Sequence, residues 1–473
     1  MTSTQPDQQS QGQITTPAPA PAPKAKTKRR AAAGPGEYTY AAGLDIGNGY
    51  VKGVIESTAT GAGAADSAVD VIDMPSVAAV LVRPNEVPDP DTTAASAIGT
   101  ESDSSAWYNN LDLSFSSSLV PDTYRRLIGR RGLASRAATI SEFDLAGNKS
   151  KAQQDLSKVL VLGILAGKAV RDYVAAHGEL PGPDSAAAHL TVRAVVALAL
   201  PIDEYERHRG LYATGFTGAA GSGDGPVVHQ VRLNNFTTPV TVSVIFDSVM
   251  VLPEGASAQF AINHYGLPLM ETMLEDATGQ GVELPEGVTA QDLLGVTDTI
   301  GIDVGEGTVN FPVFTGGQFN PDASRTMAGG YGEVLEAALS AMTEQGVNHT
   351  YSNRKQLADL LLGPISPFKR RDRAKVMEYV DSSAEFFVED LAVELSKVLS
   401  VVGSFTEVIY VYGGGSGPLR EQLYPALVTK VAEMGGDTAA PVLYLDSSYS
   451  RGLNREGLIL AARNRARTLG GTK

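Results

Sequence analysis

One stretch decides the fold of this chain: Gly301-Ile302-Asp303-Val304-Gly305-Glu306-Gly307-Thr308-Val309-Asn310. Its first apolar run predicts a strand that ends at an acid, its glycines predict a turn, and its second apolar run predicts the returning strand of a hairpin. The same pattern occurs earlier, in Gly43-Leu44-Asp45-Ile46-Gly47-Asn48-Gly49-Tyr50-Val51-Lys52. Two such turns facing each other can hold a polyphosphate from both sides, because glycine lets backbone N–H groups approach a phosphate closely.

Both hairpins place an acidic residue directly before the turn. We expect Asp45 and Asp303 to face the same gap and to hold Mg²⁺ through water, since Mg²⁺ keeps much of its hydration shell. Lys52 follows Asp45 by seven residues, so it can point back and neutralise a phosphate oxygen. Each hairpin taken alone also fits an ordinary turn, because Asp and Gly are common where strands end.

A third glycine-rich segment follows a strand predicted over residues 407–412. It reads Gly413-Gly414-Gly415-Ser416-Gly417 and precedes a helix predicted to start near Pro418. A flat adenine or ribose can lie against bare backbone at such a strand end, whereas the alternative is a tight strand-to-helix turn alone. The order and separation of the three segments favour a nucleotide site over three unrelated turns.

With these segments the chain resembles the actin/sugar-kinase/chaperone ATPase superfamily, and it is most similar there to the bacterial actin-like proteins of the ParM/StbA type, which segregate plasmids. The resemblance covers the chain from about Tyr38 onwards. The matching segments are Asp45 to Lys52 for the first phosphate motif, Asp303 to Thr308 for the second, Gly413 to Gly415 for the adenosine motif, Leu198 to Tyr205 for a Leu-Pro-x-x-Glu-Tyr segment, Val251 to Ala256 for a Pro-Glu segment and Asn454 to Gly457 for a late Asn-x-x-Gly.

The resemblance implies a two-lobed α/β fold of the actin-like, ribonuclease H-like type, which binds ATP or GTP with Mg²⁺ and hydrolyses the nucleotide. It implies catalytic roles for Glu254 and Asp303, and metal binding by Asp45 and Asp303. The residues expected to contact the nucleotide are Gly47, Asn48, Gly49, Tyr50, Lys52, Gly305, Glu306, Gly307, Thr308, Gly330, Gly413, Gly414, Gly415 and Ser416.

Glu254 lies directly before a helix predicted from Ala256. In the functional interpretation its carboxylate orients and partly deprotonates the water that attacks the γ-phosphate, because phosphoryl transfer depends mainly on positioning and charge neutralisation. The alternative is an acid that is stabilised by the dipole of the helix N-terminus. Glu306 departs from the pattern, because plasmid actins often have Gly there. A carboxylate beside a triphosphate repels it unless Mg²⁺ or its waters intervene, so Glu306 is expected to contact a metal-bound water.

Composition limits the other classes of function. The 473 residues include no cysteine, which excludes disulfides, thiolate catalysis and cysteine-based metal sites. The formal net charge is −15, and residues 1–36 are basic, so the body is more acidic still and repels nucleic acid. Only the tail is expected to approach DNA. No apolar run reaches about 18 residues, and the first residues lack a secretory pattern, so we expect a cytoplasmic protein without a membrane partner.

The length exceeds a single compact core, so two lobes are expected. We predict a disordered, Pro/Ala-rich basic tail over residues 1–36. A first lobe over 37–206 carries an inserted subdomain near 68–148, and a second lobe over 207–448 carries an inserted helical subdomain near 331–402. Residues 449–473 are predicted to form a helix that packs back on the first lobe.

The leading hypothesis is an actin-like ATPase that polymerises into dynamic, cytoskeletal filaments and segregates plasmid or other DNA, with a DNA-binding adaptor protein as a possible partner. Subunits would add head to tail. The basic cluster over residues 369–373 is interpreted as a solvated or subunit-facing surface rather than a DNA contact. The alternatives are a small-molecule kinase of the same superfamily and a nucleotide-binding scaffold. A chaperone is disfavoured, because no peptide-binding domain follows the adenosine motif.

Overall fold

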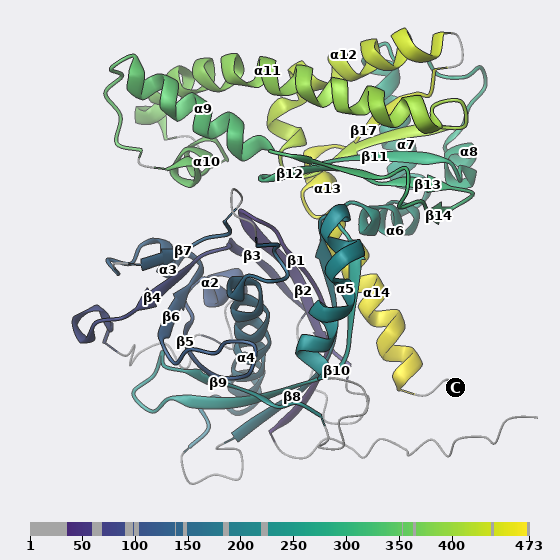
Figure 1. The fold of residues 1–473 in the computed structure, drawn as a ribbon. Coiled ribbons are helices and arrows are strands. Elements are labelled where there is room, and N and C mark those ends of the chain that lie inside the picture. The colour runs from purple at the N-terminus through teal and green to yellow at the C-terminus, as the bar shows by residue number, and fades with distance from the viewer. Residues whose placement is uncertain are drawn as a thin grey trace, which may run out of the picture.

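The computed structural model has two lobes, each built on one β-sheet, with several turns between them (Figure 1). The structure describes residues 36–58, 69–89, 98, 104–137, 139–144, 149–182, 189–218, 226–351, 353–362, 366–436 and 439–470. Apart from Gly36, the predicted basic tail therefore lies outside the described residues.

The first lobe is built on a sheet of ten strands in the order β3-β2-β1-β8-β10-β9-β5-β6-β4-β7. The strands β1, β8 and β10 are parallel at its centre, and the other neighbours pair antiparallel. The strand bounds are β1 (Glu37–Ile46), β2 (Tyr50–Ser57), β3 (Asp70–Pro75), β4 (Ala78–Leu81), β5 (Asp112–Ser116), β6 (Arg125–Ile128), β7 (Thr139–Ser141), β8 (His189–Leu200), β9 (His229–Leu233) and β10 (Val240–Pro253).

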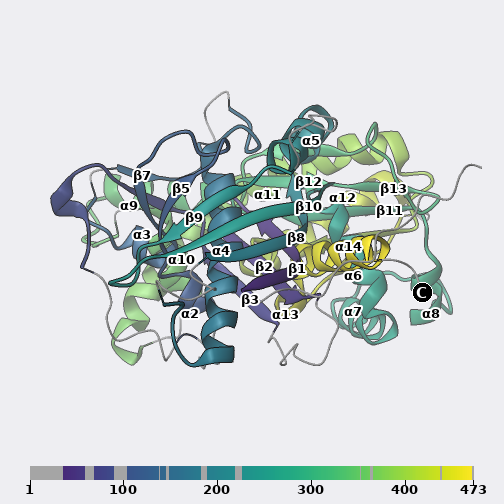
Figure 2. The ribbon, with the colours of Figure 1, turned by 90° about the horizontal axis from the view of Figure 1, so that it is seen from below.

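This sheet curves around one long helix, α4 (Asp155–His177), as Figure 2 also shows. The helix is apolar nearly all round, which suits a helix enclosed by protein. It ends at Gly178, whose φ of 74° gives a left-handed C-cap. The shorter helices of this lobe are η1 (Pro84–Glu86), α2 (Ser104–Tyr108), α3 (Gly129–Leu133) and α5 (Ile202–Thr217).

The second lobe is built on a smaller sheet of seven strands. β11 lies at its centre, paired antiparallel with β12 and β13 along one edge and parallel with β16 along the other. The strands are β11 (Thr299–Val304), β12 (Thr308–Phe311), β13 (Val313–Thr315), β14 (Gln318–Phe319), β15 (Arg325–Ala328), β16 (Val408–Tyr412) and β17 (Val442–Tyr444). The helices α9 (Tyr331–Glu344), α10 (Arg354–Leu362), α11 (Arg370–Val402) and α12 (Ser416–Gly435) form one hydrophobic core with this sheet. A second core contains α6 (Ala256–Tyr265), α7 (Leu267–Gly279) and α8 (Ala290–Gly295).

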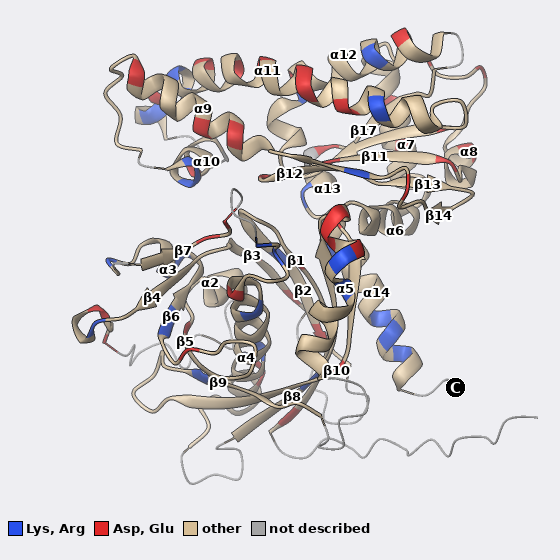
Figure 3. Cartoon of the chain, viewed as in Figure 1, with Lys and Arg blue, Asp and Glu red and all other residues tan. Residues whose placement is uncertain are grey.

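The last helix, α14 (Leu453–Leu469), follows the short α13 (Ser447–Ser450) and packs on β1 and β8 of the first lobe as well as on α6. Two glycines permit this close crossing. A Cβ at Gly43 would lie 2.2 Å from the backbone nitrogen of Ile459, and a Cβ at Gly457 would lie 1.8 Å from the carbonyl oxygen of Ser257. Several acidic side chains lie along α11, whereas basic side chains lie along α14 (Figure 3).

The predicted lobe boundary at residues 206 and 207 does not match the sheets. β9 and β10 pair within the first sheet, so that sheet extends to Pro253. Residues 247–252 do not form a separate strand, because β10 continues through a bulge at Phe246 and Ser248. The strands of residues 68–148 extend the first sheet at both edges. No helix among the described residues has the length and apolar character needed to cross a bilayer.

We expect Gly457→Ala to destabilise the protein, because the new Cβ must push α14 away from the backbone of α6. Overpacking of this kind costs roughly 1–3 kcal/mol. The matched control is Gly210→Ala in α5, where nothing lies within 4 Å of the new Cβ. That change is expected to be neutral or to stabilise by up to about 1 kcal/mol. Thermal unfolding of both variants tests this, and a Gly457→Ala protein as stable as the control would contradict the close crossing.

Candidate functional site

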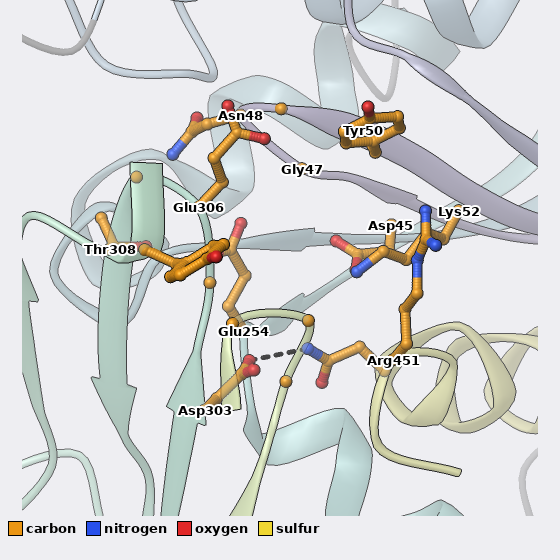
Figure 4. Close-up of a pocket in the computed structure, with 18 of the residues that line it drawn as sticks. Asp45, Gly47, Asn48, Tyr50, Lys52, Glu254, Asp303, Glu306, Thr308 and Arg451 are labelled. Carbon is orange, nitrogen blue, oxygen red and sulfur yellow. Dashed lines mark hydrogen bonds between the residues drawn. The ribbon is translucent and has the colours of Figure 1, made fainter. Parts of the chain in front are cut away.

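The two predicted hairpins face each other across a cleft between the lobes (Figure 4). The cavity that the lining residues enclose has a volume of about 120 Å³. The lining residues are Asp45, Gly47, Asn48, Gly49, Tyr50, Lys52, Glu254, Asp303, Gly305, Glu306, Gly307, Thr308, Asn310, Tyr331, Leu335, Ala358, Gly413, Gly414, Gly415, Ser450, Arg451 and Asn454.

The first hairpin joins β1 to β2, and its register places Asp45 opposite Lys52. The turn is tight, because a Cβ at Gly47 would lie 2.6 Å from the carbonyl oxygen of Tyr50. Ser76 supports the turn from behind: its hydroxyl donates to the Gly47 carbonyl at 2.6 Å, and its N–H donates to the Gly49 carbonyl. The sequence prediction for this hairpin is confirmed in its strands and its turn.

The second hairpin joins β11 to β12 and places Asp303 opposite Asn310. Its turn closes with the Gly305 N–H donating to the Thr308 carbonyl at 2.9 Å. The two turns touch, since a Cβ at Gly49 would lie only 1.2 Å from a carboxylate oxygen of Glu306. Gly49 therefore leaves the room in which the Glu306 side chain lies.

The third segment closes the cleft beside Asp303. Gly413 has a φ of 100°, and a Cβ there would lie 2.6 Å from an Asp303 carboxylate oxygen. The Gly415 N–H donates to the Val304 carbonyl at 2.8 Å, which fixes this loop to the second hairpin. Lys52 reaches across from the first lobe, because its amine lies 3.2 Å from the position of a Cβ at Gly414.

Two predicted nucleotide contacts do not line this cleft. Ser416 is fully buried at the start of α12, and its hydroxyl donates to the Gly413 carbonyl at 2.8 Å. Gly330 lies against the backbone of Gly305 and Glu306, and the next residue, Tyr331, lines the cleft instead. Contact of these two residues with a nucleotide stays a prediction.

Three carboxylates from separate strand ends meet in the cleft, and each is almost buried: Asp45 is 7% exposed, Glu254 7% and Asp303 5%. Glu254 comes directly after β10, and only Gly255 separates it from α6. It therefore lies where the chain passes from the first sheet to the second lobe. Lys151 forms an ion pair with one Glu254 oxygen, and the Asn310 amide donates to the other at 3.2 Å.

Lys151 was not predicted as a site residue, although it is buried beside the carboxylates. Burial alone would lower its pKa, but the charges of Glu254 and Asp45 more than offset this, so the pKa of Lys151 is raised and the amine stays charged. It lies just before α4, in a segment without a strand end, a glycine turn or any other local signal of a site.

Burial and charge together raise the pKa of Asp303 to about 7. Burial is the main cause, and the carboxylates of Asp45 and Glu254 add to it, whereas Asn454 and Lys52 oppose it. The pKa of Asp45 is also raised, mainly by burial and also by Glu254, against the opposing charge of Lys52. The cleft is therefore short of positive charge where the three carboxylates meet.

Asn454, in the first turn of α14, connects three elements at this place. Its amide nitrogen donates to Asp303 at 2.7 Å, and its oxygen accepts from the Gly255 N–H at 3.2 Å and from the Ser257 hydroxyl at 2.9 Å. These contacts fix the Asp303 carboxylate relative to the start of α6. The late Asn-x-x-Gly segment was the only sequence signal for this role.

Side chains also link the two lobes at the rim of the cleft. The Tyr50 hydroxyl donates to Asp359 of α10 at 3.2 Å, and the Arg451 guanidinium lies 5.5 Å from the centre of the Tyr50 ring. Arg354, at the start of α10, donates to Glu306 at 3.0 Å. Arg451, Asp359 and Arg354 were not predicted from the sequence.

The donor atoms of the cleft fit a magnesium ion bound to phosphates. Asp45 and Asp303 offer carboxylate oxygens, which Mg²⁺ prefers, and Mg²⁺ usually takes only one or two protein carboxylates beside phosphate and water. Among the described residues, no group of three or more His, Cys, Asp or Glu side chains could hold a metal ion by itself. Asp45 and Asp303 together offer the one or two carboxylates that such an ion takes.

The two sheets, the facing hairpins and the glycine-rich strand end between them define an actin-like fold. No protein-family model matches the sequence, and no curated protein matches it. Solved structures do match. The actin-like protein Alp7A has a TM-score of 0.58 at 13% identity, over 91% of this chain and 97% of Alp7A.

Two further structures are similar over 90% of this chain and 99% of their own. Bacillus thuringiensis ParM with ATP has a TM-score of 0.52 at 14% identity, and a 15-stranded ParM filament from Clostridium botulinum has a TM-score of 0.53 at 16% identity. The resemblance inferred from the motifs is thus confirmed at the level of the fold.

The pH dependence of stability tests the carboxylate cluster. Because the pKa of Asp303 rises from an ordinary 3.8 to about 7 on folding, its contribution to stability is present at low pH and is lost as pH rises through 7. Between pH 6 and pH 8 the loss is about 1.4 kcal/mol, or roughly 1–2 °C in Tm for a chain of this length. Asp303→Asn should remove this part of the pH dependence in nucleotide-free protein with a chelator present.

Thermal unfolding at the two pH values measures the difference for each protein. Asp322→Asn, which makes the same chemical change at an exposed position, should leave the wild-type pH dependence in place. If Asp303→Asn loses as much stability as the wild type between pH 6 and pH 8, the raised pKa of the buried Asp303 carboxyl would be contradicted.

Proposed function

We propose that this chain binds ATP with Mg²⁺ in the cleft, hydrolyses the ATP and assembles into dynamic filaments that segregate plasmid or other DNA. The observation that carries the proposal is the meeting of Asp45, Glu254 and Asp303 between two glycine turns. The fold shared with ParM and Alp7A, including a ParM with ATP and a ParM filament, supports it. GTP is the alternative nucleotide.

The phosphates would lie between the two turns. Backbone N–H groups of Gly47 to Gly49 and of Gly305 to Thr308 would donate to phosphate oxygens, because glycine leaves the backbone accessible. The Lys52 amine, which reaches across the cleft, would neutralise one of the oxygens. Gly413 to Gly415 offer bare backbone against which the adenosine would pack.

Asp45 and Asp303 would hold Mg²⁺, through water for at least part of its shell. When bound, the ion neutralises charge on the phosphates and so favours phosphoryl transfer. It would also relieve the repulsion between the three carboxylates that raises the pKa of Asp303. Asn454 would keep the Asp303 carboxylate oriented toward the cleft through its 2.7 Å hydrogen bond.

Glu254 would orient the attacking water and accept its proton. The water oxygen forms a bond to the γ-phosphorus while the bond from phosphorus to the bridging oxygen breaks, which releases ADP and phosphate. Lys151 and Asn310 each contact one oxygen of Glu254, so they would hold the carboxylate in one orientation.

Glu254→Gln tests the catalytic role. The amide keeps the size of the side chain but cannot accept the proton, so phosphate release is expected to slow by roughly 100-fold or more. ATP binding, measured by isothermal titration, should change little, and ATP-dependent assembly should persist. A variant that releases phosphate at the wild-type rate would show that Glu254 has no catalytic role.

Sedimentation with ATP, with ADP and without nucleotide tests assembly, with phosphate release measured in the same samples. Pelleting that requires ATP and falls as phosphate accumulates is the expected result. Hydrolysis that requires an added sugar or other hydroxyl compound would favour a small-molecule kinase instead. ATP binding without hydrolysis or pelleting would favour a nucleotide-binding scaffold.

The partners and location follow from the same proposal. A filament that moves DNA needs a DNA-binding adaptor protein, because the acidic body of the chain repels nucleic acid. Direct contact with DNA would involve only the basic tail of residues 1–36. The filaments would form in the cytoplasm.

A further inference from the structure

Phe368 has the largest exposed fraction of any large apolar side chain in the described part of the chain, at 95%. It lies in the short helix η2 (Pro367–Lys369), directly before α11. The next three residues, Lys369, Arg370 and Arg371, are exposed, and none forms an ion pair with another described residue. We refer to residues 368–371 as the basic knob.

The basic knob is unfavourable in an isolated chain. An exposed phenyl ring is unfavourable, because contact between apolar surface and water costs free energy. The cations lie at the N-terminus of the 33-residue helix α11, where the partial positive charge of the helix repels them. A surface that lowers the stability of the single chain in two ways suggests contact with a partner that is apolar and negatively charged.

A groove with these properties lies between α7 and α8. It has a volume of about 440 Å³, and Leu267, Leu274 and Ala290 supply its apolar lining. Glu271 and Glu275 line it as well. They are exposed and lie one turn apart on α7, so their like charges repel each other. We refer to this surface as the acidic groove.

The basic knob and the acidic groove lie at opposite ends of the second lobe. Figures 1 and 2 both show α9 and α10, beside the start of α11, at one end and α7 and α8 at the other. A second copy of this chain therefore offers the matching surface in the orientation that a head-to-tail contact needs.

We propose that the basic knob of one subunit docks in the acidic groove of the next, as a contact along the filament. This inference rests on the proposed assembly and identifies the surfaces that carry it. Because the two surfaces differ and lie at opposite ends, the contact does not close on itself and repeats from subunit to subunit.

The chemistry of the two surfaces is complementary. The ring of Phe368 can leave water against Leu267 and Leu274, while Arg370 and Arg371 approach Glu271 and Glu275. Opposite charges speed the encounter and disfavour wrong registers. Because exposed charges are screened by salt, the critical concentration for assembly should rise with ionic strength.

A charge-exchange experiment with full-length protein tests the contact. The knob variant carries Arg370→Glu and Arg371→Glu, and the groove variant carries Glu271→Arg and Glu275→Arg. Each variant alone then presents like charges on both surfaces, so its critical concentration for pelleting with ATP is expected to rise at least tenfold. In an equimolar mixture, every knob meets a groove of opposite charge, and assembly should return to within about threefold of the wild type.

The matched control carries Glu385→Arg and Glu389→Arg, the same change at the same spacing on the exposed face of α11. It should assemble as the wild type does. Phe368→Ala should raise the critical concentration, whereas Phe386→Ala, which removes a ring that is 73% exposed on α11, should not. ATP binding of each variant should match the wild type, and thermal unfolding should show no loss of stability.

The outcomes separate this contact from the proposed function. A wild-type protein that never pellets with ATP would overturn assembly itself, and the contact with it. If the wild type pellets, then normal assembly of either charge variant alone, failure of the mixture to assemble, or equal loss in the control variant would each overturn the contact and leave the filament function in place.

Discussion

The structure depends on the meeting of three carboxylates that arrive from different parts of the chain. Asp45 ends β1, Glu254 follows β10 and Asp303 lies near the end of β11, and all three are nearly buried. Charges removed from water are costly unless they are paired. Lys52, Lys151 and Arg455 oppose the charge of Asp45, and Lys151 pairs with Glu254. The remaining repulsion favours a cation at this place, so the arrangement suits the metal-bound polyphosphate that we propose as its ligand.

Glycine makes this meeting possible, because the elements that carry the carboxylates approach more closely than side chains would allow. Gly413 lies against Asp303, Gly49 lies against Glu306, and Gly457 lets α14 cross α6 at backbone distance. That crossing places Asn454 where it can bind Asp303 and the start of α6 together. The last helix, α14, therefore packs on the first lobe and also helps to shape the cleft. The position of the Asp303 carboxylate depends on this packing through its hydrogen bond with Asn454.

Local patterns in the sequence were enough to predict the two hairpins, the helix after Glu254 and the glycine-rich strand end, because each forms from neighbouring residues. They were not enough to place β9 and β10 in the first sheet, since β10 pairs in parallel with the distant β8 and no local signal records that partner. Lys151 was not predicted as a site residue for the same reason. Its role depends on the ion pair with Glu254, which is distant in the sequence. Ser416 belongs to a correctly predicted turn, and its hydroxyl bonds to the Gly413 carbonyl of that same turn, a contact that the sequence pattern does not reveal.

The helix α10 gives a physical connection between the cleft and the end of the lobe. Arg354 binds Glu306 of the second turn, and Asp359 accepts a hydrogen bond from Tyr50 of the first, so both contacts of α10 with the cleft end on the turns that would grip the phosphates. α10 also packs against α9 and α11, and the basic knob lies at the start of α11. A change in the separation of the two turns must therefore either break one of these contacts or move α10. Under the proposed contact between subunits at the end of the lobe, a bound nucleotide would influence assembly through α10 without touching the neighbouring subunit.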